Sequence, residues 1–364
     1  MNTSFKTASF KCGTMLLASV SLLQGCGCDE QAAGYAFPEF KETVEAEFEI
    51  ISNELFGLNA ISDIAVHDSA VIVTAFSLED GKILHLYDKN SGAPLMHTLN
   101  YGRGPKELLF ASNSCFDDNS ATMTFYDNIA SKKLTVNLDS LLAHGLDAVD
   151  ETSWQAPRWN VHDITMEKGT LLTYNISFLQ RDTSGIMRME FRNSSGELVS
   201  AYDGFPKTGD DRKRFMMYTN EIISVSPNEE RFAVTSSLGG ILETFSLENG
   251  KIKKLSTGYF VEPDFDMEGN RYVYDDLIDA FCDLHADDDV LFAAYGGETK
   301  MSDKQDERIP PFRNIAIFDW KGNALKLIRT DRRIDRLCFE KEDNTIFAVV
   351  KDPDGRSYIG RIRL

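Results

Sequence analysis

Residues 61–99 read ISDIAVHDSAVIVTAFSLEDGKILHLYDKNSGAPLMHTL, and this run decides the fold. Four short stretches rich in β-branched and aromatic residues, at 61–66, 71–76, 83–87 and 95–99, alternate with polar turns. The turn at Asp80-Gly81 offers the positive φ angles that a tight hairpin needs. Strands of this length with turns at this spacing predict one small, four-stranded antiparallel sheet.

The same unit recurs along the rest of the chain. Equivalents of the first strand begin at Asn113, Asp163, Ile222, Phe281 and Leu337, each followed by a polar turn and an apolar second strand. The period is about 50 to 60 residues, and six units fit the sequence. A repeated unit of this kind predicts an all-β, six-bladed propeller with four-stranded antiparallel blades rather than a sandwich.

The two ends of the chain are predicted to meet. The last unit, residues 332–364, contains only three predicted strands, while residues 43–51 (TVEAEFEII) alternate and belong to no unit. We expect this segment to supply the outer strand of the last blade, because pairing the ends closes the ring and removes an open sheet edge. The propeller would then span residues 43–364. Residues 139–145 are predicted to form one helical turn, and residues 301–311 an exposed loop of the fifth blade.

The N-terminus has the pattern of an export signal. Residues 1–25 contain two lysines and no acidic residue, and the apolar run 15–23 is followed by Gln24-Gly25-Cys26. This is typical of a secretory signal peptide. A cysteine after a small residue resembles the lipobox of bacterial lipoproteins, although Gln24 departs from the residue usual there. The resemblance implies that Cys26 carries the lipid; the alternative is a secreted protein with a chance cysteine.

The segment after the signal indicates where the protein would reside. Residues 26–42 are small, polar and acidic, which predicts a flexible tether. No later segment is apolar enough to span a bilayer, so we expect membrane association through the lipid anchor only. Asp29-Glu30 resembles the surface-export tags of Bacteroidota lipoproteins. The expected location is the outer membrane, with exposure at the cell surface left open.

Charge and cysteine usage exclude some classes of function. The net charge is −19, and an acidic surface repels phosphate backbones, so no nucleic-acid partner is expected. Cys115, Cys282 and Cys338 lie in strand-like stretches without a regular spacing. We expect free, buried thiols, with a disulfide as the open alternative.

Several stretches resemble one known family. They are YGRGPKEL at 101–108, SPNEERFA at 226–233, LFAAYGG at 291–297 and IAIFDWKGN at 315–323. Together they resemble the TolB-like six-bladed propeller family, found as lipoproteins in Bacteroidota. Gly296-Gly297 stands where that family usually has Ser-Gly. The resemblance implies a six-bladed propeller fold and a location in the cell envelope. It implies no activity.

The glycine-rich stretch at residues 102–107 contains Gly102, Gly104, Pro105 and Glu107. A phosphate-binding loop is the alternative interpretation, but no helix follows and Pro105 lacks a backbone donor. We therefore expect a structural motif, a tight turn between blades in which Glu107 accepts hydrogen bonds from backbone N–H groups.

One set of side chains could bind a metal ion. Asp63, Asn113 and Asp163 occupy the same offset in the first three units, where the inner strands line the centre of a propeller. Their oxygens suit calcium, an arrangement that resembles some six-bladed lactonases. The later units place Ile222, Phe281 and Arg336 near that offset, so the ring of ligands is incomplete. Turn caps at the strand starts are the alternative.

No catalytic motif is present in the sequence, and no catalytic residue is predicted. His162 beside Asp163 is the one His/acid pair near the predicted centre, and Trp154 and Trp159 could stack on sugars or pack between blades. The sequence favours a non-enzymatic binding or scaffold propeller, monomeric and without a cofactor, whose partner is an unknown protein or glycan. The alternatives are a metal-dependent hydrolase or lactonase using the calcium set, and a purely structural envelope protein.

Overall fold

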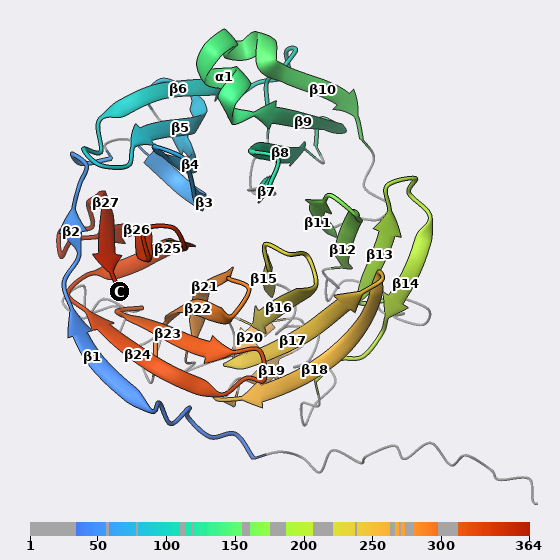
Figure 1. Cartoon of the computed structure of the whole chain (residues 1–364), viewed down its shortest axis with the longest axis vertical. Helices are drawn as coiled ribbons and strands as arrows, with labels where there is room; N and C mark the ends of the chain where they lie inside the picture. The colour runs from blue at the N-terminus through green and yellow to red at the C-terminus, as the bar shows by residue number, and fades with distance from the viewer. Residues whose placement is uncertain are drawn as a thin grey trace, which may run out of the picture. The chain divides into compact units, whose positions relative to one another are not determined.

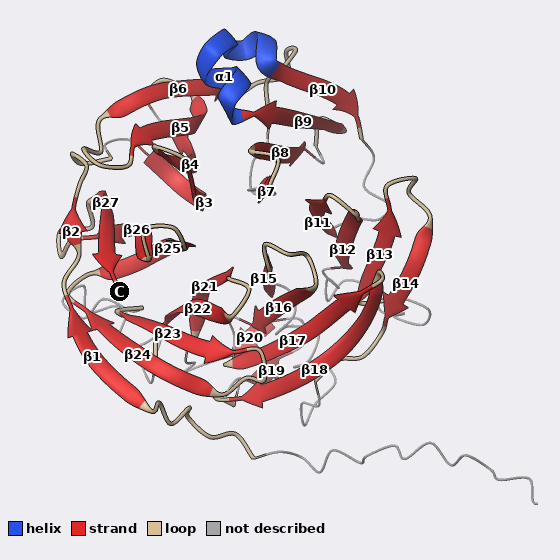
Figure 2. Ribbon diagram, in the orientation of Figure 1, coloured by secondary structure: helices blue, strands red, loops and turns tan. Residues whose placement is uncertain are grey.

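A computed structural model gives the structure of the chain. It describes residues 34–55, 58–77, 79–109, 114–117, 119–127, 129–154, 161–174, 187–206, 221–236, 239–262, 266–268, 271–273, 278, 280–297 and 312–364. Residues 34–364 form one compact unit in which strands dominate (Figure 2). None of the helices among these residues has the length and apolar character needed to cross a membrane.

Four sheets of four antiparallel strands follow one another along the chain (Figure 1). Blade 1 contains β3 (Leu58–His67), β4 (Ala70–Ser77), β5 (Lys82–Asp88) and β6 (Pro94–Asn100). Blade 2 contains β7 (Ser114–Asp117), β8 (Thr122–Asp127), β9 (Lys132–Asn137) and β10 (Val149–Ser153). Blade 3 contains β11 (Val161–Met166), β12 (Gly169–Tyr174), β13 (Met189–Asn193) and β14 (Leu198–Tyr202). Blade 4 contains β15 (Glu221–Val225), β16 (Arg231–Ser236), β17 (Ile241–Glu248) and β18 (Lys251–Tyr259).

The last two sheets include strands from the N-terminal segment. Blade 5 contains β21 (Phe281–Ala286), β22 (Val290–Tyr295), β23 (Asn314–Asp319) and β24 (Ala324–Thr330), with β1 (Glu42–Ala46) on its edge. Blade 6 contains β25 (Arg333–Glu340), β26 (Thr345–Lys351), β27 (Ser357–Arg363) and β2 (Glu49–Ile50). A small hairpin, β19 (Asp266–Glu268) and β20 (Arg271–Val273), separates β18 from β21. The predicted six-bladed propeller is confirmed, and the first strand of each blade lies nearest the centre (Figure 1).

The ring is closed by the N-terminal segment. β2 pairs antiparallel with β27, and the Ile51 N–H donates to the Ile359 carbonyl at 3.0 Å, so this segment does provide the fourth strand of the last blade. The prediction of one strand over 43–51 was wrong, because β1 instead pairs in parallel with β24 of blade 5. The chain passes from the edge of blade 5 to the edge of blade 6 at Phe48. Its N–H donates to the Asp331 carboxylate at 2.9 Å and its ring is buried in a core shared by both blades.

The core consists of apolar layers between neighbouring blades. The second strands are buried almost throughout, as in β4, because another blade covers each of their faces. The outer strand β18 instead alternates between exposed and half-buried residues. One layer contains Val73 of blade 1 and Val349 of blade 6, and another contains Leu84 of blade 1 and Phe125 of blade 2. Among the described residues, such layers join blade 1 to blades 2 and 6, blade 5 to blades 4 and 6, and blade 3 to blade 4.

The predicted helical turn is present as α1 (Leu138–His144), between β9 and β10. The Asn137 side chain accepts a hydrogen bond from the Ser140 N–H, which caps the first turn. Gly145 ends the helix with a φ of 62°, a conformation that favours glycine. Leu138 and Leu141 are buried in the layer between blades 1 and 2.

The residues just before β1 lie against the ring. The Ala36 N–H donates to the Tyr259 carbonyl at 3.1 Å, and the ring centroids of Tyr35 and Tyr259 are 5.4 Å apart. The Phe40 ring lies 5.8 Å from that of Phe318. Contacts with blades 4 and 5 therefore begin before residue 43, where the boundary of the propeller was predicted.

Candidate functional site

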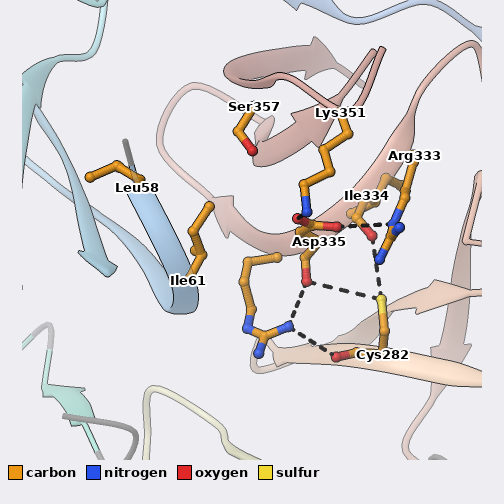
Figure 3. A pocket seen from close by; sticks show the side chains of 10 residues that line it. Leu58, Ile61, Cys282, Arg333, Ile334, Asp335, Lys351 and Ser357 are labelled. Carbon is orange, nitrogen blue, oxygen red and sulfur yellow. Dashed lines mark hydrogen bonds and ion pairs between the residues drawn. The ribbon is translucent and has the colours of Figure 1, made fainter. Parts of the chain in front are cut away.

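A pocket of about 360 Å³ lies where the inner strands of blades 5, 6 and 1 begin, and we call it the axial pocket. Its lining residues are Leu58, Ile61, Cys282, Arg333, Ile334, Asp335, Arg336, Lys351, Gly355 and Ser357. Leu58 and Ile61 lie on the β3 side, opposite Asp335 and Lys351 on the β25–β26 side (Figure 3). The inner strand β25 thus provides much of one wall, through Arg333, Ile334, Asp335 and Arg336.

Irregular pairing shapes the three inner strands at this pocket. The register shifts between Asn59 and Asp63 in β3, between Phe281 and Asp283 in β21, and between Ile334 and Arg336 in β25. Extra residues of this kind redirect side chains, and such bulges are common next to functional sites. The first paired residue after each shift is charged: Asp63, Asp283 and Arg336.

Arg336 connects three blades. Its Nε donates to the Ser62 carbonyl of blade 1 at 2.9 Å, and its Nη1 donates to the carbonyls of Asp335 at 2.7 Å and of Cys282 in blade 5 at 3.4 Å. Among the described residues, these hydrogen bonds go to backbone carbonyls rather than to carboxylates. The guanidinium is thereby fixed in place while its full charge acts on its surroundings.

Two carboxyl groups respond to that charge. Asp283 Oδ2 accepts a hydrogen bond from the Leu337 N–H at 2.7 Å, and Asp63 Oδ2 accepts one from Ser114 Oγ at 3.5 Å. Surrounding protein removes much of their hydration, which raises the pKa of Asp63 to about 7 and that of Asp283 to about 6. The charge of Asp283 adds to the rise at Asp63, and Arg336 opposes both rises. Both groups therefore titrate near neutral pH.

A single carboxylate is shared by two cations in the wall of the pocket. Asp335 Oδ1 lies 3.1 Å from Arg333 Nε, and Asp335 Oδ2 lies 2.7 Å from Lys351 Nζ. The lining thus carries three cationic side chains, Arg333, Arg336 and Lys351, against one carboxylate. The lining of the pocket is therefore positively charged, whereas the whole chain has a net charge of −19.

The cysteine of the pocket is a poor nucleophile. Cys282 Sγ donates to the Ile334 carbonyl at 3.4 Å, and burial raises its pKa well above the ordinary value. Burial also raises the pKa of Cys115 to about 12, with its Sγ donating to the Thr165 carbonyl at 3.7 Å. Cys115, Cys282 and Cys338 form no disulfide with one another. The thiols of Cys115 and Cys282 remain protonated at neutral pH, and the thiolate is the reactive form.

The structure brings together only part of the set predicted for calcium. Asp63 is at the axis with Arg336, which the sequence placed at the same offset. Asn113 lies outside the described residues, and so does the side chain of Asp163, although its backbone belongs to β11. Sequence reasoning missed Asp283, because it took Phe281 as the equivalent position and the bulge moves that position two residues along.

Other predicted residues have different surroundings. Cys26 and Trp159 lie outside the described residues, as do the side chain of His162 and the predicted loop 301–311. The Trp154 ring lies 5.1 Å from that of Tyr126, a contact within blade 2. On the exposed surface, His67 Nε2 is 3.2 Å from an Asp139 carboxylate oxygen, and Asp68 completes a possible group of three metal ligands.

The glycine-rich stretch forms the connection between blades 1 and 2. Glu107 Oε2 accepts a hydrogen bond from the Gly104 N–H at 2.7 Å, and Lys132 Nζ of blade 2 donates to the Gly104 carbonyl at 2.8 Å. A Cβ atom at Gly102 would lie 2.1 Å from the same glutamate oxygen, so a side chain there would force the Glu107 carboxylate to move. Glu107 and Lys132 thus hold the backbone of this connection through hydrogen bonds to Gly104.

A second charged cluster lies between blades 3 and 4. Arg188 is fully buried, and its Nε donates to Glu221 Oε1 at 3.0 Å while its Nη1 lies 2.6 Å from Glu243 Oε2. Nη1 also donates to the Gly204 carbonyl at 3.1 Å. Burial, with the charge of Glu243, raises the pKa of Glu221 to about 7. The cluster joins two blades inside the protein rather than at an opening.

Comparisons with known proteins agree with this architecture. The family model described as TolB-like 6-blade propeller-like matches residues 39–342. A solved structure of a Bacteroides fragilis protein named as exported is similar, with a TM-score of 0.52 and 11% identity over 89% of this chain and 99% of that one. The WD40 repeats of RRP9 give a TM-score of 0.51 with 10% identity over 90% and 100% of the two chains. None of the curated proteins matches the chain in sequence.

Proposed function

Because the chain belongs to the TolB-like 6-blade propeller-like family, we propose that it is an exported envelope lipoprotein whose ring is a rigid binding platform, with the axial pocket as its ligand site. The signal-like residues 1–25 and Cys26 support export and lipid attachment. The neighbour from Bacteroides fragilis, named as an exported protein, has the same fold. A glycan or protein of the cell envelope would be the ligand.

The observation that carries the binding function is the construction of the axial pocket. Its wall is formed by inner strands of three blades, and Arg336 links those three strands through hydrogen bonds to their carbonyls. A pocket whose lining is fixed before binding loses little conformational freedom when a ligand enters. Rigidity of this kind favours recognition of one ligand shape.

Binding is favoured over catalysis because the described groups at the pocket lack an activated nucleophile. The thiol of Cys282 has a raised pKa, and Asp335 is held by two cations. A metal-dependent hydrolase using Asp63, Asn113 and Asp163 remains an alternative prediction. The guanidinium of Arg336 acts on Asp63 and would repel a divalent cation bound there.

The test is to fill the pocket and compare the effect with a matched change elsewhere. Leu58→Trp places a large side chain in the pocket, whereas Leu255→Trp changes a leucine that is 45% exposed on the outer strand β18. Wild type and both variants are applied to a glycan array and used to capture envelope proteins. We expect wild type and Leu255→Trp to retain a shared ligand that Leu58→Trp loses.

Two results would count against the proposal. Equal binding by Leu58→Trp would remove the axial pocket from the ligand site. Turnover of a metal-activated ester or lactone, without any retained ligand, would favour the hydrolase alternative. Lipid attachment is tested separately by metabolic labelling with palmitate, which Cys26→Ser should abolish.

A further inference from the structure

We propose that the axial pocket binds a small organic acid through its carboxylate, an inference that rests on the proposed binding function. Three cationic side chains and one carboxylate lie among the lining residues, while Asp63 and Asp283 interact with Arg336 from outside that lining. Local charge of one sign in a partly enclosed site attracts a ligand of the opposite sign. The imbalance is opposite to the charge of the whole chain, which is −19, so the general composition does not explain it.

The cations are arranged to hold a planar anion. Arg333 and Lys351 lie 3.1 Å and 2.7 Å from the two oxygens of the Asp335 carboxylate. The two cations are therefore spaced so that a carboxylate can contact both. A guanidinium offers parallel N–H donors that match a carboxylate, and an ammonium adds a point charge. A ligand carboxylate beside Asp335 would share the charge of the third cation, Arg336, with the carboxyl groups of Asp63 and Asp283.

The size and the opposite wall limit the rest of the ligand. Small-molecule sites have volumes of roughly 300–1,000 Å³, so the pocket of about 360 Å³ is at the small end of that range. Leu58, Ile61 and Ile334 give it apolar surface beside the charged groups. This combination suits a molecule of monosaccharide size or smaller, with an acidic end and a less polar body.

Other ligand classes fit these surroundings less well. A cation would meet three like charges and one carboxylate that is already shared by two partners. A neutral sugar would leave the positive charges of the pocket uncompensated. A tetrahedral oxyanion such as phosphate has the negative charge of a carboxylate but not its planar geometry. The experiment therefore compares phosphate binding with carboxylate binding.

The experiment is calorimetric titration of the purified protein with glucuronate, N-acetylneuraminate and malate. Glucose and inorganic phosphate serve as the neutral and tetrahedral comparisons. Lys351→Met removes one cation of the pocket, and Lys351→Arg keeps the charge. Lys326→Met is the matched control, because Lys326 is exposed to a similar degree, 33% against 29%, and pairs with Glu42 on the outer edge of blade 5.

We expect at least one of the carboxylates to bind, with glucose weaker than glucuronate by about tenfold or more. Lys351→Met should weaken carboxylate binding by about tenfold, while Lys351→Arg and Lys326→Met should bind like wild type. The inference is overturned if none of the three carboxylates binds at millimolar concentration, if glucose binds as well as glucuronate, or if Lys351→Met has no effect. Phosphate binding as tight as that of the carboxylates would also overturn it.

The result separates this inference from the function on which it rests. A neutral ligand that Leu58→Trp loses would refute the carboxylate while leaving the binding platform in place. A carboxylate that binds equally to wild type and Leu58→Trp would refute the pocket itself.

Discussion

Arg188 and Arg336 both join blades of the ring, but in opposite surroundings. Arg188 is fully buried between blades 3 and 4 and is neutralised by two glutamates. Arg336 is half-buried at the axis, and its hydrogen bonds go to carbonyls of blades 1, 5 and 6. The cost of burying a guanidinium is offset by paired carboxylates in the first case and is reduced by partial exposure in the second.

The difference separates a structural charge from one available to a ligand. The charge of Arg188 is used within the protein, because Glu221 and Glu243 lie within 3.0 Å and 2.6 Å of it. Arg336 has the same chemistry but no carboxylate at hydrogen-bonding distance among the described residues. Substitutions should therefore affect stability most at Arg188 and binding most at the axial pocket.

The largest effect is expected for Arg188→Met. Removing the guanidinium leaves two buried carboxylates without their common partner, which costs roughly 3–5 kcal/mol in such clusters. The free energy of unfolding from urea denaturation should fall by this amount at pH 7. If the triple variant with Glu221→Gln and Glu243→Gln is as unstable as Arg188→Met, uncompensated charge is not the cause.

The next effect is a pH dependence at Glu221. Its pKa in the folded protein is about 7, above the ordinary value of 4.5, so the folded state holds this proton more tightly than the unfolded state. The stabilisation is complete below pH 4.5 and is lost as pH rises through 7, by about 3 kcal/mol. Glu221→Gln should remove this decline, as measured by unfolding at pH 5 and pH 8. A wild-type stability that rises with pH, relative to the variant, would contradict the assignment.

A smaller loss is expected for Arg336→Met. The variant leaves carbonyls of three blades without a charged donor, and a hydrogen bond to a charged group is worth about 2 kcal/mol. Because Arg336 is half-buried, water can replace part of these bonds, so stability should fall by about 2 kcal/mol rather than by the sum of three bonds. Carboxylate binding should weaken more than in Lys326→Met. Arg329→Met, on the outer strand β24, is the control and should leave both properties unchanged. The comparison fails if Arg336→Met destabilises the protein as much as Arg188→Met.

The smallest effect is expected where an arginine pairs at the surface. Arg361 of β27 lies 2.8 Å from the Glu49 carboxylate of β2, across the closure of the ring. Arg361→Gln should lower the melting temperature by about 2 °C or less, because the Glu49 side of the pair is 58% exposed and solvent weakens the attraction. Addition of salt should reduce even this difference. A shift as large as that of Arg336→Met would show that the closure depends on this pair.

The fold was predictable from the sequence because each blade repeats a local pattern. The strands predicted in residues 61–99 match β3 to β6, and the helical turn at 139–145 matches α1. Alternation alone could not divide residues 43–51, because a strand pattern does not identify the partner strand. Only the position of Asp331 and the buried ring of Phe48 mark the step from blade 5 to blade 6.

The axial pocket was less predictable, and bulges are the reason. Asp63 and Arg336 could be placed at one offset by counting from the turns, but Asp283 could not, because the shift between Phe281 and Asp283 breaks the count. Lys351 lies on the neighbouring strand β26, distant from Asp335 in the sequence, and carries no local signal of their ion pair. Register irregularities and cross-strand ion pairs are set by tertiary contacts.

The hydrogen bond from the Phe48 N–H to Asp331 spans 283 positions of the sequence, and such a separation has a consequence for folding. The segment that seals the ring is synthesised early, yet its partner strands are completed last. Contacts between such distant parts of a chain form slowly. Residues 42–50 are therefore expected to stay unpaired until β24 and β27 have formed. Glu42, Glu45 and Glu49 give this unpaired segment negative charge. Such charge disfavours pairing with the strands of other chains before β24 and β27 are available.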